Sequence, residues 1–249
     1  MKFFCCVIWL VCLITLSHTI YAQSFSSSDK QVSVLELYTS EGCSSCPPAD
    51  NWFSQLKQDK RLWTEFIPIA FHVDYWDYIG WQDSFADNTY SQRQRQYARN
   101  NKVRTVYTPG MLLNGNEWRG WFERQELKLD INVAAGKLSI KVKQQQMSAK
   151  YSAKNISDKV LILNIAILGF NLNSKISSGE NKGRILAHDF VVLGFRSIKM
   201  QQNKDSYIIE STALPEVVAN SKIKAIASWV NTEKNLSPIQ ATGGWLHNK

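Results

Sequence analysis

Cysteine is scarce in this chain. Of its five cysteines, Cys5, Cys6 and Cys12 lie near the N-terminus, and Cys43 and Cys46 are the only two beyond them. One remaining pair is too few for a framework of several disulfides. It also leaves no third thiol for an internal relay, so redox chemistry at this pair would require an external partner to reset it.

Long apolar runs are missing as well. The longest, from Phe3 to Leu16, falls short of the roughly 18 residues that a membrane-spanning helix needs. This run follows Lys2 and precedes a small residue, Ala22, which is typical of a secretory signal peptide. We therefore expect residues 1–22 to be a signal peptide, the protein to be periplasmic or secreted, and the mature chain to have no transmembrane segment.

Nucleic-acid-binding motifs are absent despite a basic composition. The formal net charge is +8 and the isoelectric point is about 9.2, but lysine and arginine are scattered singly along the chain. There is no zinc-finger spacing, no helix-turn-helix pattern and no basic-aromatic RNA-binding signature. A solvated basic surface is the simpler interpretation, and we exclude nucleic acid as a partner.

The region around the remaining cysteines predicts a β–α–β unit. An apolar, partly β-branched run over Val32–Tyr38 indicates a buried strand. Phe66–Asp74 indicates a second strand, although Pro68 interrupts its otherwise apolar run. Apolar residues at helical spacing predict a helix over residues 50–56, between the two strands. Strands joined through a helix are expected to pair in parallel.

The start of this helix decides where the two cysteines lie. Pro47 and Pro48 are tolerated only in a first helical turn, so the helix begins near Cys46, or it begins at Ser44 and bends. In both cases we expect Cys43 at the exposed end and Cys46 as the more buried partner.

An insert rich in aromatic and polar residues follows at 75–100, with a helix expected over 84–100. The dipeptide Asn114-Gly115 between apolar flanks predicts a two-residue hairpin turn. A short helix over 122–133 is expected to close a first domain that spans residues 31–133.

The segments before and after the first domain have different sequence patterns from it. Residues 24–30 are a serine-rich leader with nothing to bury, and from residue 136 onward short alternating stretches are separated by turn residues. This spacing predicts an antiparallel, sandwich-like domain over 136–249. Its expected strands are Leu138–Val142, Met147–Ala153, Val160–Leu168, Ile185–Phe195, Ser206–Glu210 and Ile223–Val230.

The CxxC pair is the strongest chemical signal. A thiolate at a helix N-terminus is stabilised by unpaired amides and the helix dipole, which makes Cys43 a nucleophile. Thiol–disulfide exchange, with Cys46 as the resolving thiol, is the leading interpretation and needs no cofactor and no metal. Two alternatives stay open: a structural disulfide, and a copper or zinc site that adds His72 to the two thiolates.

A CxxC pair after a strand, followed by a proline and a hairpin, resembles the thioredoxin-like fold. In that fold Thr108-Pro109 matches the residue and cis-proline that lie opposite the redox pair, so Pro109 is expected to shape a peptide site with Thr108. The resemblance implies an α/β thioredoxin-like domain followed by an all-β, sandwich-like domain.

The chain is also similar to one particular family, the exported proteins of domain of unknown function 1223. The similarity rests on these motifs: Glu36–Asp50, His72–Trp81, Arg93-Gln94, Tyr107–Pro109 and Gly179–Arg184. The resemblance implies a thioredoxin-like domain and export, but it implies no established activity.

Two residues depart from ordinary thioredoxins. The tryptophan that precedes the first cysteine there is Gly42 here, and the buried acid six residues before that cysteine is replaced by Leu37. The general base for Cys46 is therefore unassigned. Asp50 or Asp74 can fill that role only if the fold brings it near the thiols.

Other candidate residues have two interpretations each. Tyr75, Trp76 and Trp81 either form a groove for an apolar or unfolded peptide or roof the sheet as ordinary core. His72 and Asp74 are two apart on a strand and share a face, so they either tune the thiols or form a plain hydrogen bond.

Two charged segments are open in the same way. Arg93, Gln94 and Arg95 lie on a solvated helix face, or one arginine turns inward toward an acid of the aromatic loop. The Gly-rich stretch 179–188 either faces the thiol site and selects a partner, or simply pairs Glu180 with Arg184 across a turn. A protein or peptide thiol is the expected partner.

Overall fold

The computed structural model describes residues 22–153 and 159–247, so the expected signal peptide lies outside the described residues except for Ala22. Strands account for 45% of the described residues and helices for 12%. The helical elements of the described part are α1 (Pro47–Gln55), η1 (Leu56–Gln58), η2 (Asp77–Ile79) and α2 (Asn88–Arg99). None of these helices is long and apolar enough to cross a membrane.

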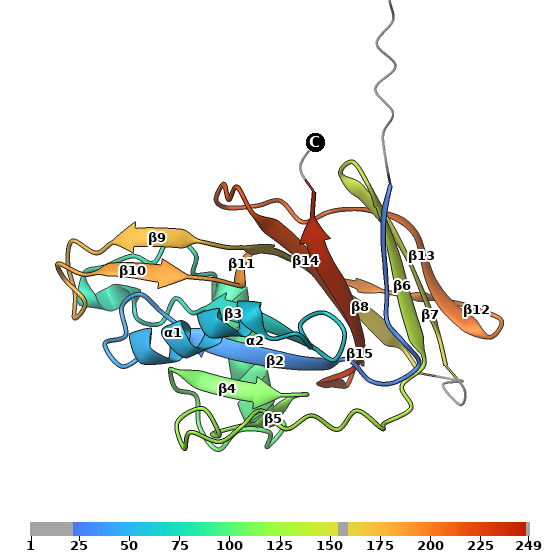
Figure 1. Ribbon diagram of the computed structural model, residues 1–249, viewed down its shortest axis with the longest axis horizontal. Coiled ribbons are helices and arrows are strands. Elements are labelled where there is room, and N and C mark those ends of the chain that lie inside the picture. Colours follow the sequence, from blue (N-terminus) through green and yellow to red (C-terminus); the bar gives the residue numbers. More distant parts are fainter. Residues whose placement is uncertain (1–21, 154–158, 248–249) are drawn as a thin grey trace, which may run out of the picture.

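A mixed sheet of eight strands forms the centre of the molecule (Figure 1). Its strands in spatial order are β15 (Asn235–Leu246), β14 (Lys224–Thr232), β8 (Leu161–Gly169), β11 (Val191–Lys199), β3 (Phe66–His72), β2 (Ser33–Thr39), β4 (Gly110–Leu113) and β5 (Asn116–Glu117). β2 runs parallel to β3, whereas β4 runs antiparallel to β2.

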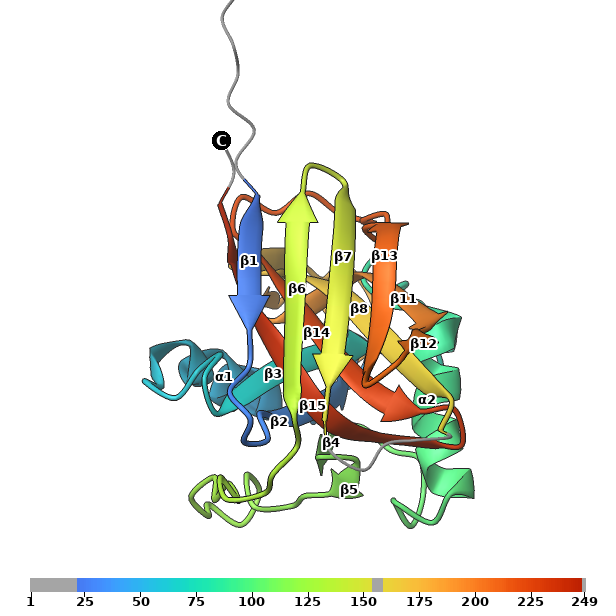
Figure 2. The same ribbon diagram turned by 90° about the vertical axis from the view of Figure 1, so that its right-hand side faces the viewer.

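A second sheet of five strands packs against one half of the first. Its order is β1 (Gln23–Ser26), β6 (Lys137–Lys143), β7 (Gln146–Ser152), β13 (Ser206–Ala213) and β12 (Gln201–Asn203). Figure 2 shows this sheet lying across β8, β14 and β15. The alternate apolar residues of β6 and β7 are buried there against the apolar face of β8. A separate hairpin, β9 (Leu172–Lys175) and β10 (Ile185–His188), lies beside α1.

The expected fold class, an α/β thioredoxin-like domain followed by an all-β sandwich-like domain, is wrong. Strands from both halves of the chain share the eight-stranded sheet, because β11 pairs in parallel with β3 at Val191 and Ala70. The amide of Ala70 donates to the carbonyl of Phe190 at 2.9 Å. The single strand expected over Ile185–Phe195 is two strands, β10 (Ile185–His188) and β11 (Val191–Lys199), and the local apolar pattern does not encode which strand lies beside β11.

Several local predictions are confirmed. Strands β2 and β3 are parallel and α1 connects them, with Cys46 as N-cap and Pro47 and Pro48 in the first turn. Pro68 has no amide hydrogen to donate, and it is tolerated inside β3 because β11 pairs with β3 only at Ala70. No hydrogen bond between the two strands is therefore lost at Pro68.

The expected hairpin at Asn114-Gly115 is confirmed as well. Both residues have positive φ angles, 50° and 78°, as a tight two-residue turn between β4 and β5 requires.

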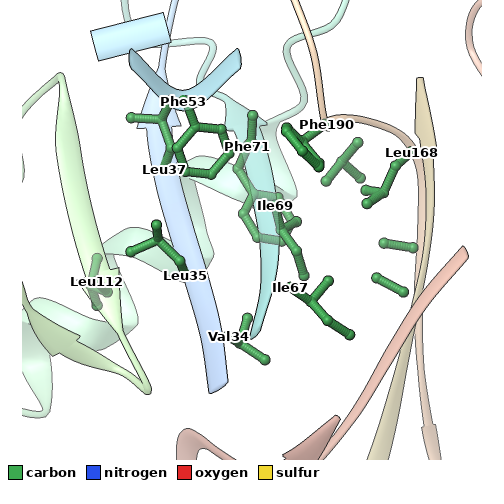
Figure 3. Close-up of a cluster of buried hydrophobic side chains, with 14 of the residues drawn as sticks. Val34, Leu35, Leu37, Phe53, Ile67, Ile69, Phe71, Leu112, Leu168 and Phe190 are labelled. Atoms are coloured by element: carbon green, nitrogen blue, oxygen red, sulfur yellow. The ribbon is translucent and has the colours of Figure 1, made fainter. Parts of the chain in front are cut away.

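The core around β2 and β3 has two faces. Leu35 and Leu37 are buried on the face that α1 covers, and Figure 3 shows Leu37 next to Phe53 of α1. Residues of opposite parity, Glu36 and Tyr38, point to the other face, where α2 lies. The carboxyl ends of the two strands therefore present different residues to α1 and to α2.

The expected helix over 122–133 does not form; this segment consists of turns and extended backbone. Of its apolar residues, Phe122, Ile131 and Val133 are exposed, whereas Leu127 is buried and its carbonyl accepts a hydrogen bond from Arg61 Nη1 at 3.1 Å. That carbonyl is thus bound by a side chain instead of a helical amide.

The serine-rich leader is also not free of structure. Its residues 24–26 belong to β1, which pairs with β6, and Phe25 packs against the apolar residues between the two sheets. β15, the longest strand, is not among the strands expected from the sequence. Gly244 is needed there, since a Cβ at that position would lie 2.6 Å from the ring of Phe25.

Candidate functional site

The two cysteines are joined in a disulfide at the carboxyl end of β2, just before α1. Their Cα atoms lie 5.4 Å apart. The carbonyl of Cys46 accepts hydrogen bonds from the amides of Ala49 and Asp50 at 2.9 and 3.1 Å, which begins the helix. In α/β arrangements the carboxyl ends of parallel strands commonly carry ligand sites. The pair therefore lies where the fold favours chemistry.

Both cysteines are fully buried, so the expectation that Cys43 lies at the exposed end is wrong. The spacer residues Ser44 and Ser45 are exposed instead. Gly42 explains part of this burial, because a Cβ there would lie 3.0 Å from Trp76 Cβ and 3.3 Å from Ile79 Cδ1. The glycine that replaces the usual tryptophan lets the aromatic insert close directly over the pair.

Residues 176–184, between β9 and β10, complete the cover; we call them the covering loop. The side-chain amide of Asn181 donates to the carbonyls of Glu41 and Cys43 at 2.8 and 3.0 Å. The Glu180 carboxylate accepts a hydrogen bond from the amide of Ser44 at 3.1 Å. The loop thus contacts the thiol site, as one of the two interpretations held, and Arg184 binds Asn181 Oδ1 at 3.0 Å.

A groove of about 250 Å³ opens beside the spacer. The residues that line it are Ser45, Tyr107, Pro109, Arg119, Trp121 and Phe122. The Thr108–Pro109 peptide bond is cis, and Cys43 Sγ lies 3.3 Å from Ser45 Oγ. The groove therefore joins the expected proline to the spacer of the CxxC pair.

The aromatic insert is held in place by hydrogen bonds. Trp76 Nε1 donates to Thr108 Oγ1 at 2.7 Å, and Trp81 Nε1 donates to Glu41 Oε2 at 2.8 Å. Tyr75 Oη donates to Gln94 Oε1 at 3.0 Å. All three rings are half-buried. The three aromatic residues therefore cover the disulfide segment, and none of them is among the residues that line the groove.

A buried polar cluster lies on the α1 side of the sheet; we call it the buried cluster, and it consists of Glu41, Asp50, His72, Asp83 and His188. His72, at the end of β3, has its Nδ1 2.7 Å from Asp83 Oδ2. Asp83 also accepts the amide of Glu41 at 2.9 Å. His72 is therefore hydrogen-bonded to an aspartate, but its partner is Asp83 and not Asp74.

His188, at the end of β10, joins the other two acids of the buried cluster. Its Nε2 lies 3.4 Å from Glu41 Oε1, and its Nδ1 lies 3.8 Å from Asp50 Oδ2. The two imidazole rings, His72 and His188, meet edge to face with centroids 5.0 Å apart. The hydroxyl of Thr39 donates to Asp50 Oδ2 at 3.1 Å.

Burial and neighbouring charges shift three pKa values in this cluster. Burial alone would lower the pKa of His72, but the charge and hydrogen bond of Asp83 raise it to about 9. Burial works to raise the pKa of Asp83, but the charge of His72 holds it below its usual range. Burial raises the pKa of Asp50, and the His188 and His72 charges offset this only in part.

Asp74 lies outside this cluster. It accepts hydrogen bonds from Ser91 Oγ and, at 2.9 Å, from Asn88 Nδ2, both on α2. Of the two acids considered as a base for Cys46, the fold brings only Asp50 to the side where the disulfide lies.

On the opposite face, Arg93 turns inward, but its partner is Glu36 of β2 and not an acid of the aromatic loop. Its Nε and Nη2 lie 2.9 Å from the two carboxylate oxygens, and the hydroxyls of Tyr38 and Tyr97 each donate to Glu36 at 2.7 Å. The guanidinium also lies over the rings of Phe71, Tyr97, Phe195 and Trp229. This pair is a structural support for the sheet.

Sequence reasoning missed Glu41 and Asp83 and did not assign a role to His188. His188 ends the Gly-rich stretch that had been singled out, and Glu41 belongs to the motif around the cysteines. Their proximity depends on β10 lying beside α1, which no local pattern encodes. Within residues 22–153 and 159–247, no group of three or more His, Cys, Asp or Glu side chains has the geometry to hold a metal ion.

Fold and site together define a β-rich protein with a buried CxxC disulfide at a helix start. The family model described as "Protein of unknown function (DUF1223)" matches residues 34–230, so the chain belongs to this family. No curated protein matches the sequence significantly.

Two solved structures share the fold. The crystal structure of protein AGR_C_4864 from Agrobacterium tumefaciens is 23% identical, with a TM-score of 0.62 over 90% of this chain and 97% of that chain. HBP35 of Porphyromonas gingivalis is 16% identical, with a TM-score of 0.57 over 88% of this chain and 76% of that chain. At these identities the likeness shows the fold alone.

Proposed function

We propose that this protein is an exported thiol–disulfide oxidoreductase that acts on protein or peptide thiols through Cys43 and Cys46. The observation that carries the proposal is the disulfide at the start of α1, whose spacer residue Ser45 borders a groove shared with cis-Pro109. Export is supported by the apolar N-terminal run, and export to an oxidising compartment suits a disulfide.

The proposed exchange begins from the reduced pair. The Cys43 thiolate attacks one sulfur of a target disulfide, and the other target sulfur leaves as a thiolate that takes a proton from water. Cys46 then loses its proton and attacks Cys43 Sγ, which releases the second target thiol and forms the Cys43–Cys46 disulfide. The target gains two electrons, and the reverse sequence oxidises a target dithiol.

The environment of Cys43 supports its role as nucleophile. It lies before a helix N-terminus, where unpaired amides and the dipole favour a thiolate. Because its side chain is buried, attack on a target requires the covering loop to move aside. The side chains that hold this loop at the CxxC segment are Glu180 and Asn181, through three hydrogen bonds.

A second candidate function has an observation of its own. The complete burial of both sulfurs favours an inert structural disulfide in a module that binds a partner by another surface. A two-residue spacer closes a very small loop, so such a disulfide restricts the unfolded chain little. This argues against a purely stabilising role and in favour of exchange.

The reduction potential of the pair separates the two functions. An oxidoreductase is expected to have a potential within the range of about −120 to −270 mV that exchange proteins cover, whereas inert structural disulfides lie below about −300 mV. The test is completed by expressing Cys46→Ser in the exported protein, which should trap mixed disulfides at Cys43. Cys43→Ser is the matched control and should trap none. A potential below −300 mV together with no trapped partner would remove the proposal.

A further inference from the structure

Unpartnered buried polar atoms are concentrated next to the disulfide. Eight buried side-chain nitrogen and oxygen atoms of the described chain have no hydrogen-bond partner, and four of them belong to the buried cluster. They are Glu41 Oε1, His72 Nε2, and both Nδ1 and Nε2 of His188. Glu41 Oε1 and His188 Nε2 face each other at 3.4 Å as an ion pair, but none of the four atoms makes a hydrogen bond, and buried polar groups without hydrogen bonds cost free energy. Free nitrogens and oxygens on titratable groups are sites that can accept a proton.

The position of Asp50 relates this cluster to Cys46. Asp50 follows Cys46 by one helical turn, and its amide donates to the Cys46 carbonyl at 3.1 Å. Side chains four residues apart lie on the same face of a helix. Both side chains are buried, Cys46 completely and Asp50 with 7% of its surface exposed. Water has little access to the Cys46 sulfur, so a buried group must take its proton.

The groups that face Asp50 come from every element around it. Thr39 Oγ1 of β2 donates to it, and His188 of β10 lies 3.8 Å away. The charges of His72, at the end of β3, and of Asp83 act on it from farther away. The next residue along the chain from His188, Asp189, is also buried, but its carboxylate pairs with Lys57 Nζ at 2.7 Å and accepts the amide of Asn171 at 2.9 Å.

We propose that Asp50 is the proton acceptor for the Cys46 thiol and that His188 positions Asp50 and shares the proton. This inference rests on the proposed function and deepens it, since it assigns the base that the missing strand acid leaves open.

The proton and electron movements are as follows. In the mixed disulfide between Cys43 and the target, an Asp50 carboxylate oxygen takes the proton of the Cys46 thiol. The Cys46 thiolate attacks Cys43 Sγ, the target thiolate leaves, and it is protonated from water. The proton on Asp50 is released through His188 when the covering loop next opens. In the opposite direction Asp50 returns its proton to the Cys46 thiolate.

The test uses the reduced full-length mature protein and an aromatic disulfide, 5,5′-dithiobis(2-nitrobenzoate), which releases a coloured thiolate at each step. The first equivalent reports attack by Cys43, and the second reports the resolving attack by Cys46. In Asp50→Asn we expect the first phase to keep its rate. The second phase should slow by about 10²- to 10⁴-fold near neutral pH, the usual contribution of a general base.

The pH profile distinguishes proton transfer from a structural effect. In the native protein the second phase should follow the titration of one group, and Asp50→Asn should replace this with a rate that rises with hydroxide. The matched control is Asp74→Asn, which removes a carboxylate outside the buried cluster and should leave both phases unchanged. An unchanged second phase in Asp50→Asn would overturn the inference.

A second variant keeps the test decisive if Asp50→Asn does not fold. Thr39→Val removes the hydrogen bond that stabilises the Asp50 carboxylate, so the midpoint of the second-phase profile should move to higher pH. A midpoint that stays in place contradicts the inference. Absence of the first phase in the native protein is a different result, because it removes the proposed function and this inference with it.

Discussion

His72 and Asp83 form a buried ion pair whose Nδ1 and Oδ2 atoms lie 2.7 Å apart, with 1% and 0% of their side chains exposed. The aspartate is further fixed by the amides of Glu41 and Phe85, at 2.9 and 3.0 Å. The pair therefore ties β3 to the segment that carries Cys43. Its protonation should be visible in the stability of the whole protein.

We predict that stability falls as the pH rises through about 9. The folded pKa of His72 is raised from 6.5 to about 9, so its contribution is fully present below pH 6.5 and is lost as pH rises through 9. At 1.36 kcal/mol per pKa unit the loss is at most about 3.4 kcal/mol. Urea unfolding of the oxidised protein from pH 6 to 10 measures it.

His72→Gln is the control for this pH dependence. The variant should be less stable than the native protein at pH 6 and should lose the decline between pH 6.5 and 9. An equally steep decline in the variant would assign the effect to other groups.

The covering loop should control access to the disulfide. Asn181 Nδ2 binds the carbonyls of both Glu41 and Cys43, so Asn181→Ala removes two hydrogen bonds and leaves buried acceptors. Each such loss costs about 1–3 kcal/mol, which corresponds to a rise of tenfold or more in the population of the open loop. The rate of disulfide reduction by a water-soluble phosphine should rise by a similar factor.

Lys182→Ala is the matched control for the covering loop. Lys182 lies in the same loop and is exposed, and its backbone amide, which bonds Gly179 at 3.2 Å, is retained in the variant. The reduction rate of this variant should equal that of the native protein. If Asn181→Ala also showed the native rate, the loop would not be the barrier.

The Arg93–Glu36 pair should be the main polar support of the α2 side. Arg93→Met leaves a buried carboxylate without its cation, which typically costs about 3–5 kcal/mol. Combining it with Glu36→Gln should recover part of this loss, because the uncompensated charge is then gone. Chemical denaturation of the two single variants and the double variant measures the coupling. Arg99→Met, on the exposed end of α2, should have almost no effect.

Local signals explain what could be predicted from the sequence. β2, α1 and β3 have apolar periodicities of their own, and Asn114-Gly115 encodes its turn within two residues. Cys43, Cys46 and Pro109 were recognisable for the same reason, since each belongs to a short motif. These predictions depend on backbone preferences and burial patterns that act over a few residues.

Long-range contacts explain what could not be predicted. The pairing of β3 with β11 depends on an open strand edge and a distant apolar segment, so the expected fold class, an α/β domain followed by an all-β sandwich, was natural but wrong. His188 meets Glu41 and Asp50 only because β10 packs beside α1. The burial of Cys43 likewise depends on the covering loop, which lies more than a hundred positions away in the chain. Asn181 of this loop donates a hydrogen bond to the Cys43 carbonyl.

The groove beside Pro109 should determine which disulfides react. Phe122 lines it with 68% of its surface exposed, and Arg119 adds a positive charge. A peptide that covers the Phe122 ring would gain roughly 1.5–3 kcal/mol if the ring became fully buried, so a partial contact corresponds to about tenfold in affinity. Phe122→Ala should therefore lower kcat/KM for a peptide disulfide about tenfold while leaving the rate with a small aromatic disulfide unchanged.

Ile185→Ala is the control, because Ile185 is 71% exposed and is not among the groove-lining residues. Equal losses in the two variants, or equal losses with the two substrates, would mean that the groove does not bind the target.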